Sequence, residues 1–380
     1  MAKRPVRDGV FQRHPPRRQR SNEGRRVASA VRLDAGNMAS SVEQQLERDS
    51  EAARLRGELT ALRKKYEVAI KSLDAERERT QSLTALRGIA PRGARLRGRS
   101  RRKHRATMLL MVSDVHAEER VDPATVNGMN DYSLAVCDRR MAELRQRFFA
   151  MLDHERQLAD IRRVMIWIGG DVISGHIHPD TAELAQLAPL AACRWVGSRL
   201  RHLIDTAADN ADEVVVATNS GNHGRSTEKL RIGTETEHSF EQNLYLMMAA
   251  EEKRPNVSWH VGAGYLNYVD LDGFVVRCQH GHAIKYSGGS YGLALPATKA
   301  IAGWDSVRRA DLNIWGHYHT FGWLRAARYV SNGSVIGHSA YATVRVRAGY
   351  ERPCQGAVVI DHERNEVTKA YPIFCDGDLA

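Results

Sequence analysis

Residues 214–225 read VVVATNSGNHGR. The first four of them are apolar, as in a β-strand that is buried on both faces. An amide and an imidazole follow almost at once between two glycines, in Gly221-Asn222-His223-Gly224. A tight turn accounts for the glycines, because glycine reaches backbone conformations that other residues avoid. A turn does not account for His223. We expect a functional role for this histidine only if residues that can bind a metal also follow other strands.

Four further apolar runs end in the same way. The runs at 108–112, 164–168, 274–278 and 312–315 are followed by Ser113-Asp114-Val115-His116, Gly169-Gly170-Asp171, Gln279-His280-Gly281-His282 and Gly316-His317-Tyr318-His319. Because sites in α/β sheets form at the carboxyl ends of the strands, we expect these side chains to converge. A single strand-end histidine is usually a satisfied polar group, but five such strand ends are not explained in that way. Imidazole, carboxylate and amide donors without thiolates favour two Mn, Fe or Zn ions over a structural zinc.

The order of the predicted elements indicates an α/β fold. Helices are expected at 132–158, 180–208, 238–252 and 297–309, and further strands at 257–261, 265–269 and 358–360. Strands and helices alternate in the first half of this region and strands cluster in the second half. Such an order is typical of sheets that are covered by helices.

In this order the motifs DxH, GD, GNH, H and GHxH resemble those of the calcineurin-like metallophosphoesterase superfamily, over about residues 107–345. The resemblance implies a four-layer α/β/β/α sandwich within a domain of residues 107–380, with two metal ions in its site. It implies that Asp114, His116 and His319 bind the first ion, that Asn222, His280 and His317 bind the second, and that Asp171 bridges both. His280 is preferred to His282 as the ligand because His280 stands next to the strand.

The same resemblance implies a metal-dependent phosphoric ester hydrolase. Two divalent ions, with Mn²⁺ expected before Fe or Zn, would convert a bridging water to hydroxide and neutralise the phosphoryl oxygens. His223 resembles the family's histidine that donates a proton to the leaving oxygen. The predicted catalytic residues are therefore His223 and Asp171.

The chain departs from the family's pattern in two places. The third motif commonly ends in Asp or Glu, which orients the histidine, whereas this chain has Gly224 there. His223 therefore needs another partner, which the sequence does not reveal. No arginine closely follows the second motif, which argues against a serine/threonine protein phosphatase. Candidates for substrate contacts are Arg225, whose guanidinium suits a phosphate, and the loop histidines His178 and His282.

Smaller details indicate an origin and a location. The segments GNHGR, GDVISGHIHP and NGSVIGHSAYA resemble phosphoesterases of tailed phages and prophages, which are grouped loosely with DNA-repair exonuclease-like proteins. The five cysteines form no CxxC pair, and no apolar run has the length of about 18 residues that a membrane span needs. We expect a cytoplasmic protein of a bacterium or a phage-infected bacterial host, without a membrane partner.

The basic character of the chain is concentrated at the N-terminal end. The net charge is +11, but residues 1–105 alone hold 28 Lys and Arg against 12 Asp and Glu, so the remainder is slightly acidic. Residues 1–40 are expected to be a basic disordered arm, and residues 87–106 a basic linker. We expect nucleic acid to bind through residues 1–40 and 87–105, because Lys and Arg side chains neutralise its phosphate groups. The alternative is a tail that only keeps the protein soluble.

Between the two basic segments, residues 41–86 are predicted to form an amphipathic helix of the coiled-coil type. Apolar residues recur in steps of four and three at Leu55, Leu59, Leu62, Tyr66, Ala69 and Leu73. Such a seam either makes homo-oligomers through residues 42–83 or packs a single helix on the globular domain.

These features together predict a metal-dependent phosphodiesterase or nuclease that acts on nucleic acid. The alternative is a phosphodiesterase or phosphatase for a nucleotide or another small molecule, with the basic N-terminus as an interaction tail. A scaffold without activity is disfavoured because every ligand position is filled.

Overall fold

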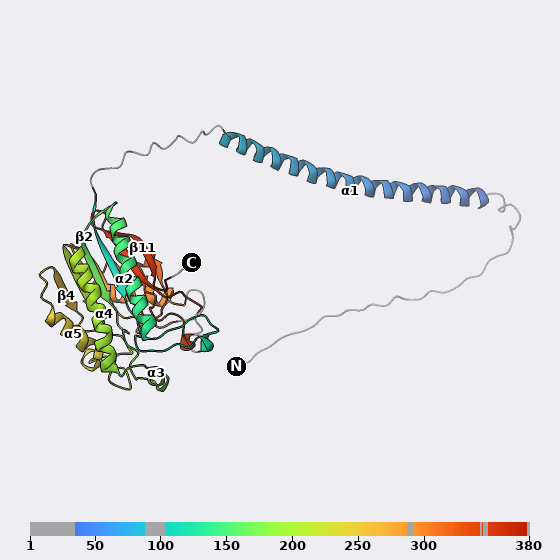
Figure 1. Cartoon of the computed structure of the whole chain (residues 1–380). Helices are drawn as coiled ribbons and strands as arrows, with labels where there is room; N and C mark the ends of the chain where they lie inside the picture. Colours follow the sequence, from blue (N-terminus) through green and yellow to red (C-terminus); the bar gives the residue numbers. More distant parts are fainter. Residues whose placement is uncertain (1–34, 88–102, 287–291, 343, 345–348, 378–380) are drawn as a thin grey trace, which may run out of the picture. The chain divides into compact units, whose positions relative to one another are not determined.

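The computed structural model describes residues 35–87, 103–286, 292–342, 344 and 349–377. The chain forms two compact units, Met1–Arg97 and Gly98–Ala380. The described part of the first unit is one helix, α1 (Ala35–Arg87, 53 residues), and the second unit holds all the other elements (Figure 1). The arm predicted at 1–40 lies outside the described residues except for 35–40, which belong to α1.

Two β-sheets form the centre of the second unit. The first sheet has six strands in the order β11-β10-β1-β2-β3-β4, and the second has five in the order β5-β6-β7-β9-β8. The first comprises β1 (Arg105–Val112), β2 (Asp160–Ile168), β3 (Glu213–Thr218), β4 (Val257–Val261), β10 (Cys354–Asp361) and β11 (Glu366–Phe374). The second comprises β5 (Asn267–Leu271), β6 (Phe274–Cys278), β7 (Leu312–Trp315), β8 (Gly322–Leu324) and β9 (Tyr329–Ser331). Strands β1 to β4 run parallel to one another, as do β6, β7 and β9.

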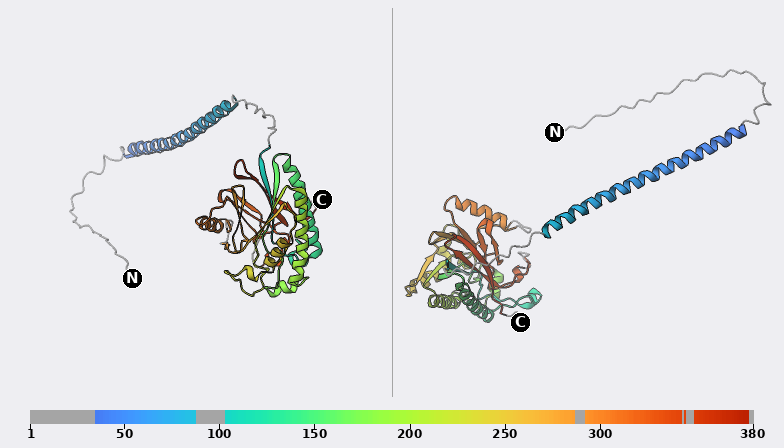
Figure 2. Two further views of the ribbon diagram at one scale, coloured as in Figure 1. Left: turned by 90° about the vertical axis from the view of Figure 1, so that its left-hand side faces the viewer. Right: turned by 90° about the horizontal axis from the view of Figure 1, so that it is seen from above.

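Helices complete four layers. Side chains of α2 (Leu134–Arg156), α4 (Pro189–Asn210) and α5 (Phe240–Glu251) pack on one face of the six-stranded sheet. Helix α6 (Ala294–Asp305) packs on the outer face of the five-stranded sheet. Figure 2 shows α6, in orange, on the opposite side of the sheets from the green helices α2 and α4. The predicted α/β/β/α sandwich is therefore confirmed.

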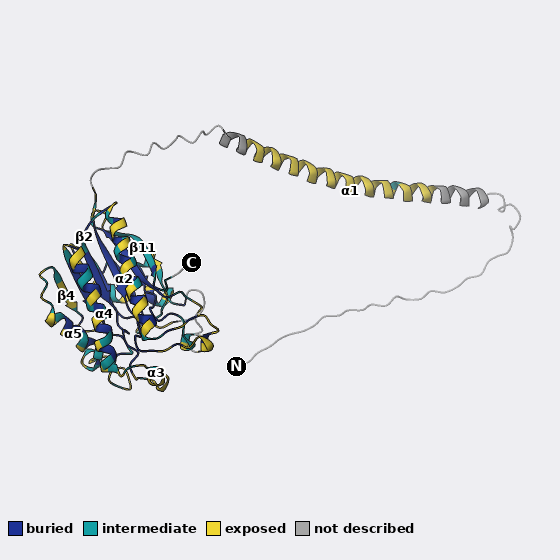
Figure 3. Cartoon of the chain, viewed as in Figure 1, coloured by how far each residue is buried: buried dark blue, intermediate teal, exposed yellow. Residues whose placement is uncertain are grey.

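The central strands are apolar because both of their faces are buried (Figure 3). In β1, Leu109 and Met111 pack between the two sheets, whereas Met108 and Leu110 pack under the helices. Burying one such side chain stabilises the fold by about 1.5–3 kcal/mol, so a polar residue at any of these positions is costly. The continuous apolar runs of the sequence mark these strands correctly.

The long helix predicted at 180–208 is wrong, because the chain forms two helices there. Helix α3 (Pro179–Leu184) ends before a short extended segment, and α4 begins at Pro189. Ala188 has an extended backbone, with φ −67° and ψ 153°. A residue before proline is disfavoured in the helical region, so Pro189 separates the two helices. The extended segment pairs with Glu119 through a β-bridge at Ala185 and so borders the loop after β1.

All five cysteines are buried, and none forms a disulfide with another. Burial raises the pKa of the Cys137 and Cys193 thiols to about 12, so neither is a nucleophile at neutral pH.

No helix among the described residues is long and apolar enough to cross a membrane.

Candidate metal centre

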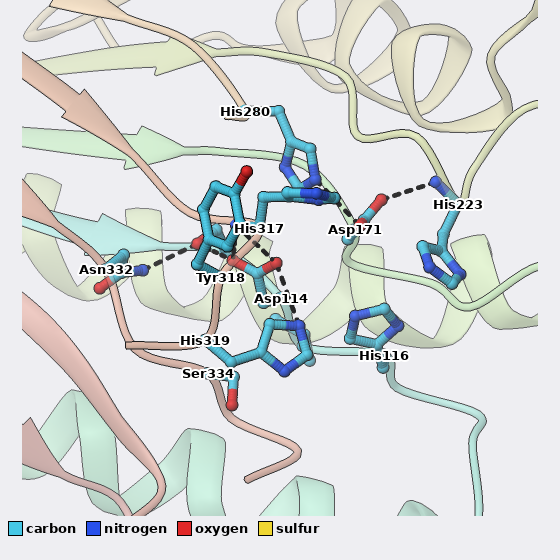
Figure 4. Close-up of polar contacts among 12 residues, drawn as sticks. Asp114, His116, Asp171, His223, His280, His317, Tyr318, His319, Asn332 and Ser334 are labelled. Atoms are coloured by element: carbon cyan, nitrogen blue, oxygen red, sulfur yellow. Dashed lines mark hydrogen bonds and ion pairs between the residues drawn. The ribbon is translucent and has the colours of Figure 1, made fainter. Parts of the chain in front are cut away.

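Side chains from five strand ends meet at the carboxyl edge of the two sheets (Figure 4). They form two groups that are suited to metal ions, Asp114 with His116 and His319, and Asp171 with His280 and His317. Within each group the candidate ligand atoms lie within 4.8 Å of one another. Strands β1 and β2 lie in one sheet and β6 and β7 in the other, so packing of the two sheets assembles the site.

In the first group, Asp114 is fully buried and fixed by the loop after β7. Its carboxylate accepts a hydrogen bond from the backbone N–H of His317 at 2.9 Å, and its Oδ1 lies 3.4 Å from Nε2 of His319. The carboxylate therefore ties the first sheet to the second. These contacts hold the carboxylate at the edge of the site, where a cation that binds it would offset the cost of burying its charge.

His116 presents one ring nitrogen to the site in the form that binds metals. Its Nδ1 lies 2.9 Å from Oγ of Ser174, whose hydroxyl donates to Oε2 of Glu119 at 2.6 Å. Because that hydroxyl proton points to Glu119, Nδ1 of His116 carries the donated proton and Nε2 is a free acceptor. This Nε2 is buried and has no hydrogen-bond partner among the described residues. Burial lowers the pKa of His116 well below its usual value, which keeps the ring neutral.

In the second group, the ring of His280 contacts two other predicted ligands. Its Nδ1 donates to the carbonyl oxygen of Gly169 at 2.8 Å, so Nε2 faces the site. That nitrogen lies 2.9 Å from Oδ2 of Asp171 and 3.1 Å from Oδ1 of Asn222. Burial lowers the pKa of His280, but the charge of Asp171 outweighs burial and the pKa is raised to about 10. A proton on Nε2 thus stands where a cation would bind, and the donor set of this group fits a divalent metal.

This geometry makes metal affinity depend on pH. Below pH 10 the binding of the second ion to His280 must displace one proton, so the affinity for that ion should increase about tenfold per pH unit. His317, whose pKa burial lowers, should release none. Mn²⁺ titration calorimetry at several pH values measures the slope, and His280→Gln should lower it by one proton. His202→Gln, on the exposed face of α4, is the matched control. A slope that His280→Gln leaves unchanged contradicts the assignment.

Several of the predicted ligands have an unusual backbone conformation. Nine non-glycine residues of the described chain have positive φ, and five of them are Asp114, His116, Asp171, His317 and His319, with φ between 49° and 66°. Such conformations cost of order 1 kcal/mol or more each and persist only where the surroundings enforce them. They cluster at functional sites, so the loops are held in place to aim these side chains.

His223 lies beside both groups but belongs to neither. Its backbone N–H donates to Oδ1 of Asp171 at 2.7 Å, and its Nδ1 lies 3.2 Å from the carbonyl oxygen of Ser174. Its ring packs edge-on against His116, with the ring centres 4.9 Å apart, and His178 lies 6.3 Å away on the other side. A carbonyl only accepts, so Nδ1 keeps its proton and Nε2 can carry a second one. The partner of His223 is thus a backbone carbonyl.

The remaining predicted substrate contacts have neighbours of their own. The guanidinium of Arg225 donates to the carbonyl oxygens of Asn222, Thr227 and Glu228, at 2.5 to 3.0 Å, and so closes its own loop. His282 lies 3.2 Å from Glu235 through Nε2, and its ring centre is 5.6 Å from that of His280. Their roles toward a substrate stay predictions.

Sequence reasoning missed Glu241, a buried carboxylate on α5 that holds two of the metal-ligand loops. Its Oε1 accepts from the backbone N–H of Val172 at 2.7 Å, and its Oε2 from that of Gly221 at 2.7 Å and of Asp171 at 3.3 Å. Burial and the charge of Asp171 raise the pKa of Glu241 to about 8. A Cβ at Gly224 would lie 2.5 Å from Cγ of Glu241. Glu241 therefore holds the loops of the second and third motifs through their backbone N–H groups, and Gly224 leaves room for its side chain.

A double-mutant cycle tests this relation. Gly224→Ala should destabilise the protein by about 1–3 kcal/mol, because the added methyl overlaps Glu241. Glu241→Ala should cost about 3 kcal/mol, because it leaves buried N–H groups without an acceptor. With both changes, Gly224→Ala should add less than about 0.5 kcal/mol. Urea unfolding followed by tryptophan fluorescence measures the cycle, since all six tryptophans lie in the second unit.

The matched control for this cycle is Gly303→Ala, because an added Cβ at that position meets nothing within 4 Å. That substitution should leave stability unchanged or slightly raise it. Equal costs of Gly224→Ala with and without Glu241 would mean that the two residues are independent.

A second support that sequence reasoning missed holds Asp114. Ser113 donates to Oδ2 of Asp114 at 2.5 Å, and its own hydroxyl accepts from Nδ2 of Asn332 at 2.9 Å. Gln355 on β10 accepts from the backbone N–H of Ser113 at 2.8 Å. Asn332 follows β9 directly, so a sixth strand end contributes to the site. The only sequence signal was the position of Asn332 after a short apolar run.

Comparisons with known proteins place the chain near several solved structures. No family model matches it, and no curated protein does. A predicted phosphoesterase from Streptococcus pneumoniae is 13% identical, over 70% of this chain and 98% of that one, with a TM-score of 0.29. Vps29 from Entamoeba histolytica is 12% identical over the same shares, with a TM-score of 0.25. A putative 5′-nucleotidase from Staphylococcus aureus is 13% identical, over 72% of this chain and 55% of that one, with a TM-score of 0.34.

At these identities and TM-scores the likeness supports no inference by itself. The structure itself indicates the class of protein. It is an α/β/β/α sandwich with two groups of metal-ligand residues at the carboxyl edge of its strands. This fold and this order of ligand-bearing loops agree with the calcineurin-like metallophosphoesterase superfamily that the motifs resemble. The narrower resemblance to phage and prophage proteins stays a prediction.

Proposed function

We propose that the chain is a dinuclear-metal phosphoesterase that hydrolyses phosphodiester bonds of nucleic acid. The observation that carries the proposal is the convergence of Asp114, His116 and His319 beside Asp171, His280 and His317. When bound, a pair of divalent ions supplies an activated water nucleophile and neutralises the phosphoryl oxygens. Mn²⁺ is the ion we expect first, and Fe or Zn are the alternatives.

The protein's own residues hold the ions and move one proton. Asp114, His116 and His319 would hold the first ion, Asn222, His280 and His317 the second, and Asp171 both. His223 lies beside the two groups and is partly buried, with Nδ1 fixed by a carbonyl oxygen. Its Nε2 is therefore placed to give a proton to the leaving alkoxide.

The charge distribution supports nucleic acid as the substrate. The chain carries its excess of Lys and Arg before residue 106, whereas residues 106–380, which bear the site, hold 28 Lys and Arg against 33 Asp and Glu. A polymer with many phosphates would be captured by such a segment through release of counterions, with little dependence on sequence. A small phosphate ester would gain little from it, which makes a nucleotide the second choice of substrate.

The test is Mn²⁺-dependent hydrolysis of single- and double-stranded DNA and RNA, beside bis-p-nitrophenyl phosphate and p-nitrophenyl phosphate. Changing Arg95, Arg97 and Arg99 to glutamine should weaken cleavage of the polymer about tenfold or more, and weaken it less at high salt. Hydrolysis of the small diester should be unchanged. The matched control changes Arg54, Lys64 and Lys71 on α1 to glutamine and removes the same charge.

Hydrolysis of the small esters alone, with no polymer cleaved, would instead make the chain a phosphodiesterase or phosphatase for small molecules. Equal losses in the two charge variants would mean that total charge matters and residues 87–105 do not. Absence of binding of Mn²⁺, Fe²⁺ and Zn²⁺ alike would remove the proposal altogether.

A further inference from the structure

Helix α1 carries an apolar seam that the helix itself leaves uncovered. The seam residues Leu55, Leu59, Leu62, Tyr66 and Leu73 are each 51–68% exposed, and Figure 3 shows the described part of the helix as exposed along its length. Isolated helices owe little of their stability to propensity and need a packed apolar face. A helix of 53 residues with this seam is therefore expected to have a partner surface.

The seam fixes a heptad register. With Leu59, Tyr66 and Leu73 at position a, position d holds Leu55, Leu62 and Ala69. Gly57 then falls at position f, on the face opposite the seam, and nothing lies within 4 Å of a Cβ added there. The weakest helix former of the segment thus stands where no partner packs.

The flanking charges select both the partner and its direction. Positions g hold Glu51, Glu58 and Lys65, and positions e hold Arg56, Arg63 and Ile70, all of them exposed. In a parallel pair of helices each g side chain meets the e side chain five residues further along the other helix. Glu51 would thus meet Arg56 of a second copy, and Glu58 would meet Arg63 of that copy. An antiparallel pair would instead set Glu against Glu and Arg against Arg.

We infer that α1 forms a parallel, in-register coiled coil with a second copy of this chain. The five-residue spacing of Glu to Arg occurs twice beside the same seam, and packing α1 on the chain's own globular unit would need no such match. The inference is independent of the proposed phosphoesterase activity. In a parallel pair both copies of the basic N-terminal segment precede the same end of the coil, so a polyanion could be bound by two arms at once.

Charge reversal tests the pairing in the full-length protein. Wild type should show twice the chain mass of 42.6 kDa by light scattering on a sizing column. One variant carries Glu51→Arg with Glu58→Arg, and the other carries Arg56→Glu with Arg63→Glu. Each alone places like charges on both flanks and should raise the dissociation constant at least about tenfold. An equimolar mixture should restore the dimer.

Controls and the orientation test use the same helix. Lys64→Glu with Lys71→Glu, at positions f, should leave the dimer intact. Ala52→Cys and Leu73→Cys, at positions a at the two ends of the seam, should each form a disulfide between two copies. The five native cysteines are buried, so background cross-linking should be low. Failure of both variants to cross-link in a dimer overturns the parallel arrangement.

A wild-type protein that stays at 42.6 kDa at high micromolar concentration overturns the pairing itself. In that case α1 covers its seam on its own globular unit. Circular dichroism of each variant shows whether the helix is retained, which separates loss of pairing from loss of folding.

Discussion

Asp171→Asn is expected to lower metal-dependent phosphodiester hydrolysis by at least about a thousandfold, or about 4 kcal/mol of transition-state stabilisation. Asp171 is 1% exposed, and its two oxygens serve different loops. Oδ1 accepts from the backbone N–H of His223 at 2.7 Å, and Oδ2 lies 2.9 Å from Nε2 of His280. The amide keeps the shape of the side chain but removes the charge that the proposed second metal needs.

Two measurements separate this loss from misfolding. Initial rates on bis-p-nitrophenyl phosphate give the activity, and calorimetry with Mn²⁺ gives the number of bound ions, which should fall by at least one. The variant should also lower the pKa of His280, because the charge of Asp171 raises that pKa to about 10. Asp153→Asn, on a carboxylate that is 79% exposed, is the matched control. Activity within about tenfold of wild type, with full metal content, would remove Asp171 from the site.

The fold could be predicted because its signal is local. Strands β1, β2, β3 and β7 are short apolar runs buried on both faces, and each is followed within a few residues by a side chain with metal-ligand chemistry. Parallel strands bring their carboxyl ends to one edge, so the order of the motifs was enough to expect that Asp114, Asp171 and Asn222 converge. The structure brings them together with the four predicted histidines.

Residues that support the ligands could not be predicted, because they come from other elements. Glu241 lies on α5, and the apolar and polar residues around it follow the pattern of an ordinary helix. Ser174 and Glu119 meet only because the loops after β1 and β2 are adjacent. The one clue was negative, since Gly224 stands where an acid is usual. A Cβ at Gly224 would lie 2.5 Å from Cγ of Glu241, so the Glu241 side chain fills the space next to this glycine, and only the packed structure contains that information.

Strands β8, β9 and β11 were missed for a related reason. Strands β8 and β9 have three residues each, too few to establish an alternation of apolar and polar side chains. Strand β11 is longer, but it is half-buried along most of its length and contains Pro372. Proline is tolerated at the edge of a sheet, where β11 lies, although it argues against a central strand.

His223→Gln is expected to lower the hydrolysis rate of nucleic acid by about 10²–10⁴-fold and to leave metal content unchanged. The imidazole belongs to neither ligand group, and glutamine cannot donate a proton to a leaving alkoxide. On p-nitrophenyl esters the loss should be far smaller, because p-nitrophenolate leaves without being protonated. The ratio of the two losses therefore reports proton donation rather than a general disturbance of the site.

The geometry makes this ratio a strict test. The ring of His223 is fixed by the carbonyl oxygen of Ser174 and by edge-on packing against His116, so replacement also removes packing at the first metal group. A purely structural role would slow both kinds of substrate equally and would lower Mn²⁺ affinity. His202→Gln, an exposed histidine on α4, should change neither. Only a loss that is confined to basic leaving groups, at full metal content, identifies His223 as the proton donor.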